Sequence, residues 1–249
     1  MSAWPKGYGL RLLETVDSTL NEAARMAPGL TGPVWILARE QTAARGRRGR
    51  AWVMPRGNLA ATLVMRMTEP PEVAALRSFV TALALFDACA AVSGRSEAFA
   101  LKWPNDVLLN GGKLAGILLE SAGTARAPGH LAIGIGVNLA DAPPAELVEP
   151  GAVRPVSLLS ETGTAITPDD FLPYLAAAYA VRDAQFTTYG FAPIRSAWLD
   201  RAARLGETIT ARTGAQSTTG RFETVDAQGN LVLVTPTGRT AIAAADVYF

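Results

Sequence analysis

The feature that most restricts the fold of this chain is a long stretch that is apolar nearly all round. It follows Pro70-Pro71 and runs from Glu72 to Val92, with the composition of a helix. A helix that lacks a polar face is buried inside a protein or a membrane. Its most apolar part, Phe79 to Val92, contains Asp87 and is too short to span a bilayer. The sequence therefore predicts a well-buried helix of a globular protein.

Composition supports an ordinary globular protein and excludes several kinds of site. The 249 residues are 49% hydrophobic and 18% charged, which fits one large domain or a main domain with a small appendage. The one cysteine, Cys89, excludes an internal disulfide and a cysteine-based zinc cluster. The one histidine, His130, argues against a histidine-rich metal site and a Ser-His-Asp triad. The first residues lack the apolar run of a secretory signal, so we expect a cytoplasmic protein.

Short apolar runs on both sides of the predicted helix have the length of buried strands. The side chains of Asp17-Ser18-Thr19 can cap a helix that continues through Asn21, and residues 168–203 show helical spacing. This mixture predicts an α/β (α+β) catalytic domain with a mixed sheet over residues 1–203. The predicted strands are Tyr8–Glu14, Val34–Ala38, Asn58–Met67, Leu114–Ser121 and Leu131–Leu139.

The pattern changes near Gly206, where short β-rich runs separated by turns begin. The segments Asp226-Ala227-Gln228-Gly229 and Pro236-Thr237-Gly238 have the composition of turns. This rhythm predicts a second, small domain over residues 204–249, built as a five-stranded β-barrel. Its β-rich runs are Glu207–Arg212, Thr218–Val225, Asn230–Thr235 and Arg239–Ala243.

Positive charge is concentrated in one short segment. Between Arg39 and Arg56, six arginines stand against one acid, whereas the rest of the chain is mildly acidic and the net charge is only +1. Glycines allow tight folding around a ligand, guanidinium groups bind carboxylate and phosphate through two hydrogen bonds, and Trp52 offers a face for stacking. The segment Arg45-Gly46-Arg47-Arg48-Gly49-Arg50-Ala51-Trp52, called the basic loop below, therefore favours binding of a small anionic ligand. A solvated loop and an RNA-binding tract are the alternatives.

A second group of polar residues surrounds a predicted turn. Lys102 precedes Trp103-Pro104-Asn105-Asp106, where its ammonium can act as a point charge for an acyl phosphate or an α-phosphate. Asn105 and Asp106 could bind a ligand or help to hold a metal ion. An ordinary proline-containing turn is the alternative.

Glycines interrupt two of the predicted strands. Gly116 lies among apolar residues, and Gly134 and Gly136 alternate within Gly134-Ile135-Gly136-Val137-Asn138. A glycine inside a strand weakens it and indicates close approach of a ligand or another backbone. A flat ligand is one explanation for the alternating pair, and a β-bulge is the other.

In their order along the chain, these motifs resemble those of the biotin protein ligases. The resemblance is close over residues 10–140, and the C-terminal β-rich segment is similar to the small SH3-like domain of that family. The motifs that carry it are Asp17-Ser18-Thr19, the basic loop, Lys102-Trp103-Pro104-Asn105-Asp106, Gly112-Lys113-Leu114-Ala115-Gly116-Ile117 and Gly134-Ile135-Gly136-Val137-Asn138.

The resemblance implies an enzyme that joins biotin to a protein in two steps. It would make biotinyl-5′-AMP from biotin and MgATP, and then transfer biotin to one lysine of a biotin carboxyl carrier protein domain of acetyl-CoA carboxylase or a related carboxylase. Lys102 and Arg47 are the implied catalytic residues, because cations held in place offset the repulsion between the biotin carboxylate and the α-phosphate. Mg²⁺ would arrive with ATP, and the resemblance implies no metal ligand of the protein.

The same match implies two sets of binding residues. Neutral donors and acceptors suit the cyclic urea of biotin, whereas an aromatic ring, an amide and cations suit ATP. The implied biotin-binding residues are Ser18, Thr19, Leu20, Gln41, Arg45, Gly46, Arg47, Lys102 and Gly116. The implied ATP- and adenylate-binding residues are Arg47, Arg50, Trp52, Lys102, Asn105, Lys113 and Asn138.

Two residues depart from the family pattern. Ala44 stands where the family usually has glycine, which could alter closure of the basic loop or retention of the adenylate. Leu20 stands where asparagine usually follows Asp-Ser-Thr, which could remove a polar contact to biotin. A lipoate or octanoate ligase, which shares the fold and the acyl-adenylate chemistry, and a non-catalytic sensor of biotin or nucleotide are the alternative functions.

The family also includes members with an N-terminal helix-turn-helix domain. Here the catalytic motifs begin by residue 10, so we expect no such domain, no sequence-specific DNA binding and no membrane partner. Family members are often dimers, which leaves a homodimer open.

Overall fold

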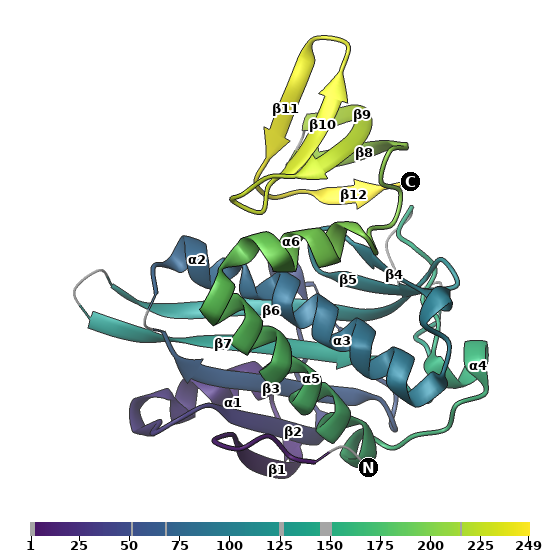
Figure 1. Ribbon diagram of the computed structural model, residues 1–249. Coiled ribbons are helices and arrows are strands. Elements are labelled where there is room, and N and C mark those ends of the chain that lie inside the picture. Colours follow the sequence, from purple (N-terminus) through teal and green to yellow (C-terminus); the bar gives the residue numbers. More distant parts are fainter. Residues whose placement is uncertain (1–2, 51, 68, 125–126, 145–150, 215) are drawn as a thin grey trace.

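A seven-stranded mixed sheet forms the larger part of the protein (Figure 1). The computed structural model describes residues 3–50, 52–67, 69–124, 127–144, 151–214 and 216–249, so Ala51 of the basic loop lies outside the described residues. The strands β1 and β2 are parallel, and every other neighbouring pair is antiparallel, which confirms the predicted mixed sheet. The order across the sheet is β1 (Gly9–Val16), β2 (Val34–Gln41), β3 (Leu59–Arg66), β7 (Ala127–Val137), β6 (Gly112–Thr124), β5 (Asp106–Leu109) and β4 (Phe99–Lys102).

Helices cover both faces of this sheet. The helices α3 (Arg77–Ser93) and α5 (Pro168–Tyr189) pack on one face, and α1 (Thr19–Met26) packs on the other. Alternation along the strands explains the two layers, because neighbouring side chains of a strand point to opposite faces. In β2, Trp35 belongs to the large core under α3 and α5, whereas Ile36 belongs to a smaller cluster under α1. The remaining helical segments are α2 (Pro71–Ala75), α4 (Leu158–Thr162), α6 (Phe191–Leu199), η1 (Ala27–Gly29), η2 (Arg47–Gly49) and η3 (Ser96–Ala98).

Two predicted helices differ in detail from the observed ones. The predicted helix Glu72–Val92 is divided at Leu76 into α2 and α3. The predicted helical region 168–203 is divided at Gly190, which has a φ of 73° and separates α5 from α6. A glycine adopts this left-handed backbone at little cost, so the chain turns there.

The apolar stretch Pro71–Ser93 is, by length and composition, sufficient to cross a membrane. Its sequence alone therefore does not exclude a membrane span, contrary to the expectation from Phe79–Val92. In the structure 72% of its most apolar window is buried, and α3 packs against α5, α6 and the sheet. The protein core thus accounts for its hydrophobicity.

A second, five-stranded antiparallel sheet forms the C-terminal part, as predicted (Figure 1). The sequence indicated four of its strands but missed the fifth, β12, which has only three residues. The strand order runs from β11 at one edge of this sheet to β12 at the other. The domain boundary between residues 203 and 204 stays a prediction. The strands are β8 (Thr208–Thr213), β9 (Gln216–Val225), β10 (Leu231–Thr235), β11 (Gly238–Ile242) and β12 (Asp246–Tyr248).

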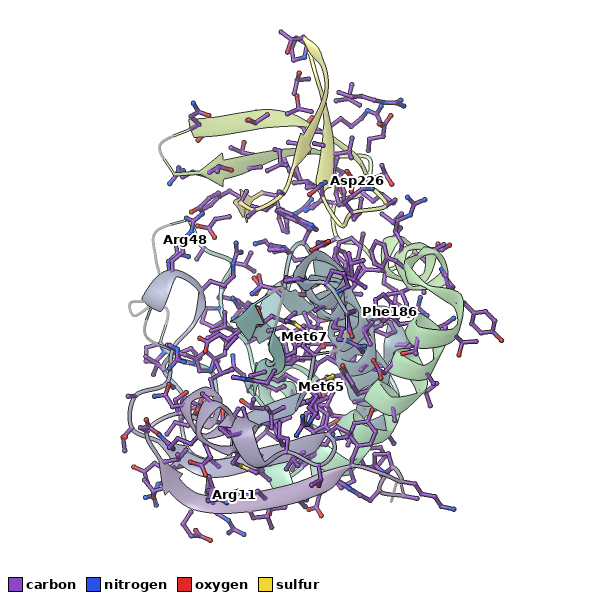
Figure 2. The ribbon with its side chains drawn as sticks, turned by 90° about the vertical axis from the view of Figure 1, so that its left-hand side faces the viewer. Arg11, Arg48, Met65, Met67, Phe186 and Asp226 are labelled. Atoms are coloured by element: carbon purple, nitrogen blue, oxygen red, sulfur yellow. The ribbon has the colours of Figure 1, made fainter. Side chains whose placement is uncertain are left out.

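The two sheets are joined by a packed interface. The indole Nε1 of Trp103 donates a buried hydrogen bond to the carbonyl of Gly229, at 3.0 Å. A Cβ atom at Gly229 would come within 2.9 Å of Leu76 and 3.1 Å of Phe79, so the turn at Gly229 lies directly on the start of α3. In Figure 2 the turn that carries Asp226 faces these helices. One continuous apolar core therefore runs through both parts of the chain.

Candidate functional site

A cavity of about 470 Å³ lies between the basic loop, the sheet and β12. Every residue that the sequence assigned to biotin or ATP lines this cavity, from Ser18 at one end to Asn138 at the other. The structure therefore brings together all of the predicted site residues. Their contacts with ligands stay predictions.

The floor of the cavity is made of glycines. Gly116 of β6 pairs with Gly136 of β7, so two residues without side chains face each other across the strands. The Trp52 indole lies on this floor, because a Cβ atom at residue 136 would be 2.7 Å from the indole and one at residue 116 would be 3.2 Å away. A Cβ atom at Gly134 would be 2.9 Å from Leu20. A flat ring does lie against one of the two alternating glycines, Gly136, and it belongs to the protein, whereas the other glycine is covered by Leu20.

Neutral polar groups lie at one end of the cavity. The backbone N–H of Thr19 and its hydroxyl both donate to Oε1 of Gln41, at 2.8 and 3.0 Å. Thr62 donates to the same Thr19 hydroxyl at 2.8 Å, which fixes its orientation. Ser18 caps α1 by accepting from the N–H of Leu20, and as a hydroxyl it keeps a proton to donate. This end offers donors and acceptors without net charge.

The positive charge of Arg45 is balanced by a carboxylate of the protein. Its guanidinium donates to both carboxylate oxygens of Glu120, at 2.9 and 2.8 Å, and also to the side chain of Asn21 at 2.7 Å. Arg45 lines the cavity, but its charge is balanced by this two-bond pair. It therefore adds little positive potential to the neutral end.

Lysines lie at the other end of the cavity. Lys113 Nζ is 2.8 Å from Asp106 Oδ1, and Lys102 Nζ is 3.8 Å from Asp106 Oδ2. The side chain of Lys102 is only 10% exposed, and its ammonium lies 5.5 Å from the centre of the Phe249 ring. Burial lowers the pKa of Lys102, and Asp106 opposes this in part. Two lysines thus share one carboxylate, which leaves positive charge facing the cavity.

The basic loop is closed on itself by two backbone hydrogen bonds. The N–H of Trp52 donates to the carbonyl of Ala44, and the N–H of Gly46 donates to the carbonyl of Arg50. Ala44 is not among the described residues with positive φ, so this conformation does not require glycine there. Arg48 does have a left-handed backbone, with a φ of 57°.

Arg47 points from the basic loop into the cavity. Its Nη1 donates to the side chain of Asn105 at 3.4 Å and to the carbonyl of Ala245 at 3.2 Å. Burial lowers the pKa of Arg47, although the acids Asp246 and Asp106 favour its charged form. Arg47 thus connects the basic loop, the turn after Lys102 and the C-terminal sheet.

Asn138 is buried, and only one of its two polar side-chain atoms has a hydrogen-bond partner among the described residues. Its amide nitrogen donates to the carbonyl of Val156 at 3.0 Å, while its Oδ1 has no hydrogen-bond partner among the described residues. A buried acceptor without a partner is destabilising, so this oxygen is free to accept from a donor that the described residues do not supply. The side chain of Asn105 instead has a protein partner at both of its polar atoms, because its amide nitrogen also donates to the carbonyl of Ile117.

Sequence reasoning missed the contribution of the C-terminal strand. Asp246, Val247 and Tyr248 of β12 line the cavity, and Asp246 forms ion pairs with the basic loop. An isolated acid in a short strand carries no recognisable motif, so no local signal could have identified it. Glu120 was also missed, because it lies 75 positions from its partner Arg45 in the chain.

Comparisons with known proteins agree with this geometry. The biotin/lipoate A/B protein ligase family matches residues 12–138, and the biotin protein ligase C terminal domain matches residues 205–249. The chain is 58% identical over 238 residues to the biotin–[acetyl-CoA-carboxylase] ligase of Paracoccus denitrificans, covering 96% of this chain and 99% of that protein. It is 31% identical over 216 residues to the bifunctional ligase/repressor BirA of Bacillus spizizenii, covering 85% of this chain but only 65% of that protein.

A solved structure shows the same fold. The biotin protein ligase from Aquifex aeolicus in complex with biotin and ATP superposes with a TM-score of 0.81 at 24% identity, covering 96% of this chain and 97% of that chain. A family match over half of the chain and 58% identity over nearly its full length establish the relationship. The chain belongs to the biotin/lipoate A/B protein ligase family, among the biotin protein ligases.

Proposed function

We propose that the protein is a biotin–[biotin carboxyl-carrier protein] ligase. It activates biotin with MgATP to form biotinyl-5′-AMP and transfers biotin to a specific lysine of a carrier domain. The observation that carries the proposal is the division of one cavity into a neutral polar end and a cationic end. A ligand with a polar neutral ring and a carboxylate fits this division, and so does a nucleotide whose phosphates meet that carboxylate in the middle.

In the first step a biotin carboxylate oxygen attacks the α-phosphorus of ATP. The bond from this phosphorus to the bridging oxygen breaks, pyrophosphate leaves, and a mixed anhydride forms. Both reacting groups are anions, so the step needs fixed positive charge. We assign this role to Lys102 and Arg47, because both are largely buried and both face the cavity. No covalent intermediate with the enzyme is required.

For biotin, the proposal uses the neutral end. The Ser18 hydroxyl can donate to the urea carbonyl, and the Gln41 amide, whose oxygen is held by Thr19, can meet the urea edge. The bicyclic ring and valeryl chain would lie beside Leu20 and next to the Trp52 indole, which itself covers Gly116. Leu20 packs on Gly134, so this chain offers an apolar surface where the family pattern usually has asparagine.

For the nucleotide, the proposal uses the cationic end. The unpartnered Asn138 Oδ1 is an acceptor that suits the exocyclic amine of adenine, whereas the carbonyl of guanine would repel it. Trp52 would stack with the adenine ring, and Arg50 and Lys113 would contact phosphate. Asn105 would contribute by holding Arg47.

Magnesium is treated as part of the substrate MgATP. No group of three or more His, Cys, Asp or Glu side chains that could hold a metal occurs within the described ranges. Mg²⁺ commonly binds through substrate phosphates and one or two carboxylates. Asp106, next to Lys102 and Lys113, is the carboxylate in the cavity best placed to assist.

In the second step the amine of the carrier lysine attacks the carbonyl carbon of the anhydride. An amide bond forms, the bond to the phosphate oxygen breaks, and AMP leaves. We propose as the carrier the biotin carboxyl carrier domain of acetyl-CoA carboxylase or a related carboxylase, because the Paracoccus relative is named for that substrate. A cytoplasmic location, a lack of specific DNA binding and an open choice between monomer and homodimer belong to the same proposal.

The test is pyrophosphate release with biotin, octanoate or lipoate, each with and without a carrier domain. Biotin-dependent release followed by label on the carrier lysine is the expected result. Turnover with octanoate or lipoate alone would move the protein to the lipoate branch. Binding of biotin without pyrophosphate release would indicate a sensor instead of a ligase.

A further inference from the structure

One carboxylate of the C-terminal sheet forms ion pairs with three arginines of the basic loop. Asp246 Oδ2 accepts hydrogen bonds from Arg48 Nη1 at 2.7 Å and from Arg50 Nη2 at 3.0 Å. Arg47 Nη1 lies 3.6 Å from Asp246 Oδ1. Arg48 and Asp246 are 198 positions apart in the chain, so this cluster joins the two sheets. In Figure 2 the loop that carries Arg48 reaches up to the C-terminal sheet.

The position of Asp246 is fixed by its own sheet. The strand β12 pairs with β8, where Asp246 lies opposite Arg212, and its neighbours Ala245 and Val247 are buried. The Asp246 side chain is only 14% exposed, so its charge is poorly screened by solvent. A rigidly held carboxylate of this kind can determine where mobile arginine side chains lie.

The cluster lies in a part of the site where several cations come together. Arg47, Arg48 and Arg50 approach one another at Asp246, and both lysines of the cavity lie nearby with Asp106 as their shared partner. Without the carboxylate of Asp246, the arginines would repel one another more strongly and the loop would tend to open.

The backbone of Arg48 supports the same interpretation. A left-handed conformation is unfavourable in a residue other than glycine, and it persists only where other contacts enforce it. The 2.7 Å ion pair with Asp246 is such a contact. The loop conformation is thus held from the C-terminal sheet.

We propose that Asp246 is a positioning residue that serves as an internal counter-anion for the basic loop. It holds Arg47, Arg48 and Arg50 folded over the cavity, and it keeps them there when the phosphates of a nucleoside triphosphate bind as a second anion. The C-terminal sheet thereby prepares the nucleotide end of the cavity before the nucleotide arrives. This inference rests on the proposed function only in its second part, the binding of phosphate beside Asp246.

The first test measures loop closure without any substrate. The Asp246→Asn variant keeps the size of the side chain and removes its charge. We expect a protease of broad specificity to cut within residues 45–52 several times faster in this variant than in the unchanged protein. Saturating biotin and ATP should abolish the difference, because phosphate then supplies the missing anion. Glu223→Gln is the matched control, since it removes an acid of the same sheet that pairs with Arg239 away from the cavity.

The second test separates positioning from general stability. Three partly exposed ion pairs are together worth about 1 kcal/mol, so Asp246→Asn should raise the KM for ATP about fivefold. The value of kcat and the KM for biotin should change little, because bound phosphate restores the loop and the neutral end has its own contacts. Asp246→Glu, which retains the charge, should recover most of the loss.

Several results would overturn the inference. Equal cleavage of Asp246→Asn and unchanged protein without substrate would show that the carboxylate does not hold the loop. Faster cleavage that persists with biotin and ATP, or that spreads over the C-terminal sheet, would show a purely structural role. A lower KM for ATP would show that Asp246 only competes with phosphate. If the unchanged protein releases no pyrophosphate, the proposed function fails, whereas the cleavage comparison without substrate still decides the first part of the inference.

Discussion

The two ends of the cavity are organised by different kinds of contact. At the neutral end, Thr19 and Gln41 are joined by short hydrogen bonds between residues that are 22 positions apart, within the first part of the sheet. At the cationic end, Arg48 is held by Asp246 from the other sheet, 198 positions away. One end is therefore set by the local fold, and the other depends on how the two sheets meet.

This difference predicts which of the two substrates each substitution should affect. Hydrogen bonds among buried neutral groups are hardly affected by distant charge, so changes at the neutral end should alter biotin binding alone. The cationic end is a balance among several charges, so changes there should alter ATP binding and the chemical step. Lys102 is the buried cation of the cationic end that we assign to both reacting groups, so its removal should have the largest effect.

We expect Lys102→Ala to lower the rate of adenylate formation by about a hundred- to a thousandfold, as loss of one preorganised charge does in other active sites. The fold should survive, because Asp106 keeps its 2.8 Å pair with Lys113. Pyrophosphate release and thermal melting measure the two properties separately. Lys6→Ala, at an exposed position, is the control. Near-normal activity of Lys102→Ala would remove the assigned role.

The same lysine should set an alkaline limit on activity. Burial lowers its pKa below the ordinary value of about 10.4, and the ammonium form is present only below the pKa. As pH rises through this lowered pKa, the charge is lost and adenylate formation should fall at a lower pH than an ordinary lysine would give. In Lys102→Arg the side chain stays charged over this pH range. The plot of its activity against pH should therefore lack this alkaline decline, even if its rate is reduced. An identical alkaline decline in Lys102→Arg would show that another group is responsible for the loss of activity.

The neutral end and the glycine floor were largely predictable from the sequence. Ser18, Thr19 and Gln41 lie in or beside elements with clear local signals, and alternating glycines such as Gly134 and Gly136 need a reason inside a strand. The structure supplies that reason, because Leu20 and Trp52 occupy the space that side chains would fill. Local pattern and local structure agree in this region.

The cationic end was only half predictable. The arginines of the basic loop were evident, but their partner Asp246 was not, because no local pattern connects residues separated by most of the chain. For the same reason, the pairing of Arg45 with Glu120, 75 positions away, could not be predicted. Charges are easy to count in a sequence, whereas their pairing depends on tertiary structure.

The next largest effect should come from Asn138→Ala, which removes the unpartnered Oδ1. Losing one buried hydrogen bond to adenine costs about 1.5 kcal/mol, so the KM for ATP should rise about tenfold with little change in the KM for biotin. The preference for ATP over GTP should fall by a similar factor. Asn58→Ala, another buried asparagine with protein partners, is the control for stability alone. An unchanged preference for ATP would separate Asn138 from base recognition.

The opposite selectivity is expected for Gln41→Leu. The substitution removes the acceptor for the N–H and hydroxyl of Thr19 and leaves both without that partner. We expect the KM for biotin to rise by up to about tenfold, while the KM for ATP stays within twofold. Steady-state kinetics with each substrate varied in turn measure both values, and Gln41→Glu, which keeps an acceptor oxygen, should lose less. A parallel rise in both KM values would show that the two ends are coupled after all.

The smallest effect should follow Ala44→Gly, which restores the residue usual in the family. The described conformation has no positive φ at Ala44, and its carbonyl already accepts from the N–H of Trp52. Glycine therefore relieves no strain and adds freedom to the open loop, at a cost of about 0.5 kcal/mol or slightly more. The KM for ATP should rise by about two- to threefold, and release of biotinyl-5′-AMP into solution should increase slightly. Faster adenylate formation in Ala44→Gly would instead mean that Ala44 restrains a loop movement that the reaction needs. The cationic end would then be limited by backbone stiffness as well as by its balance of charge.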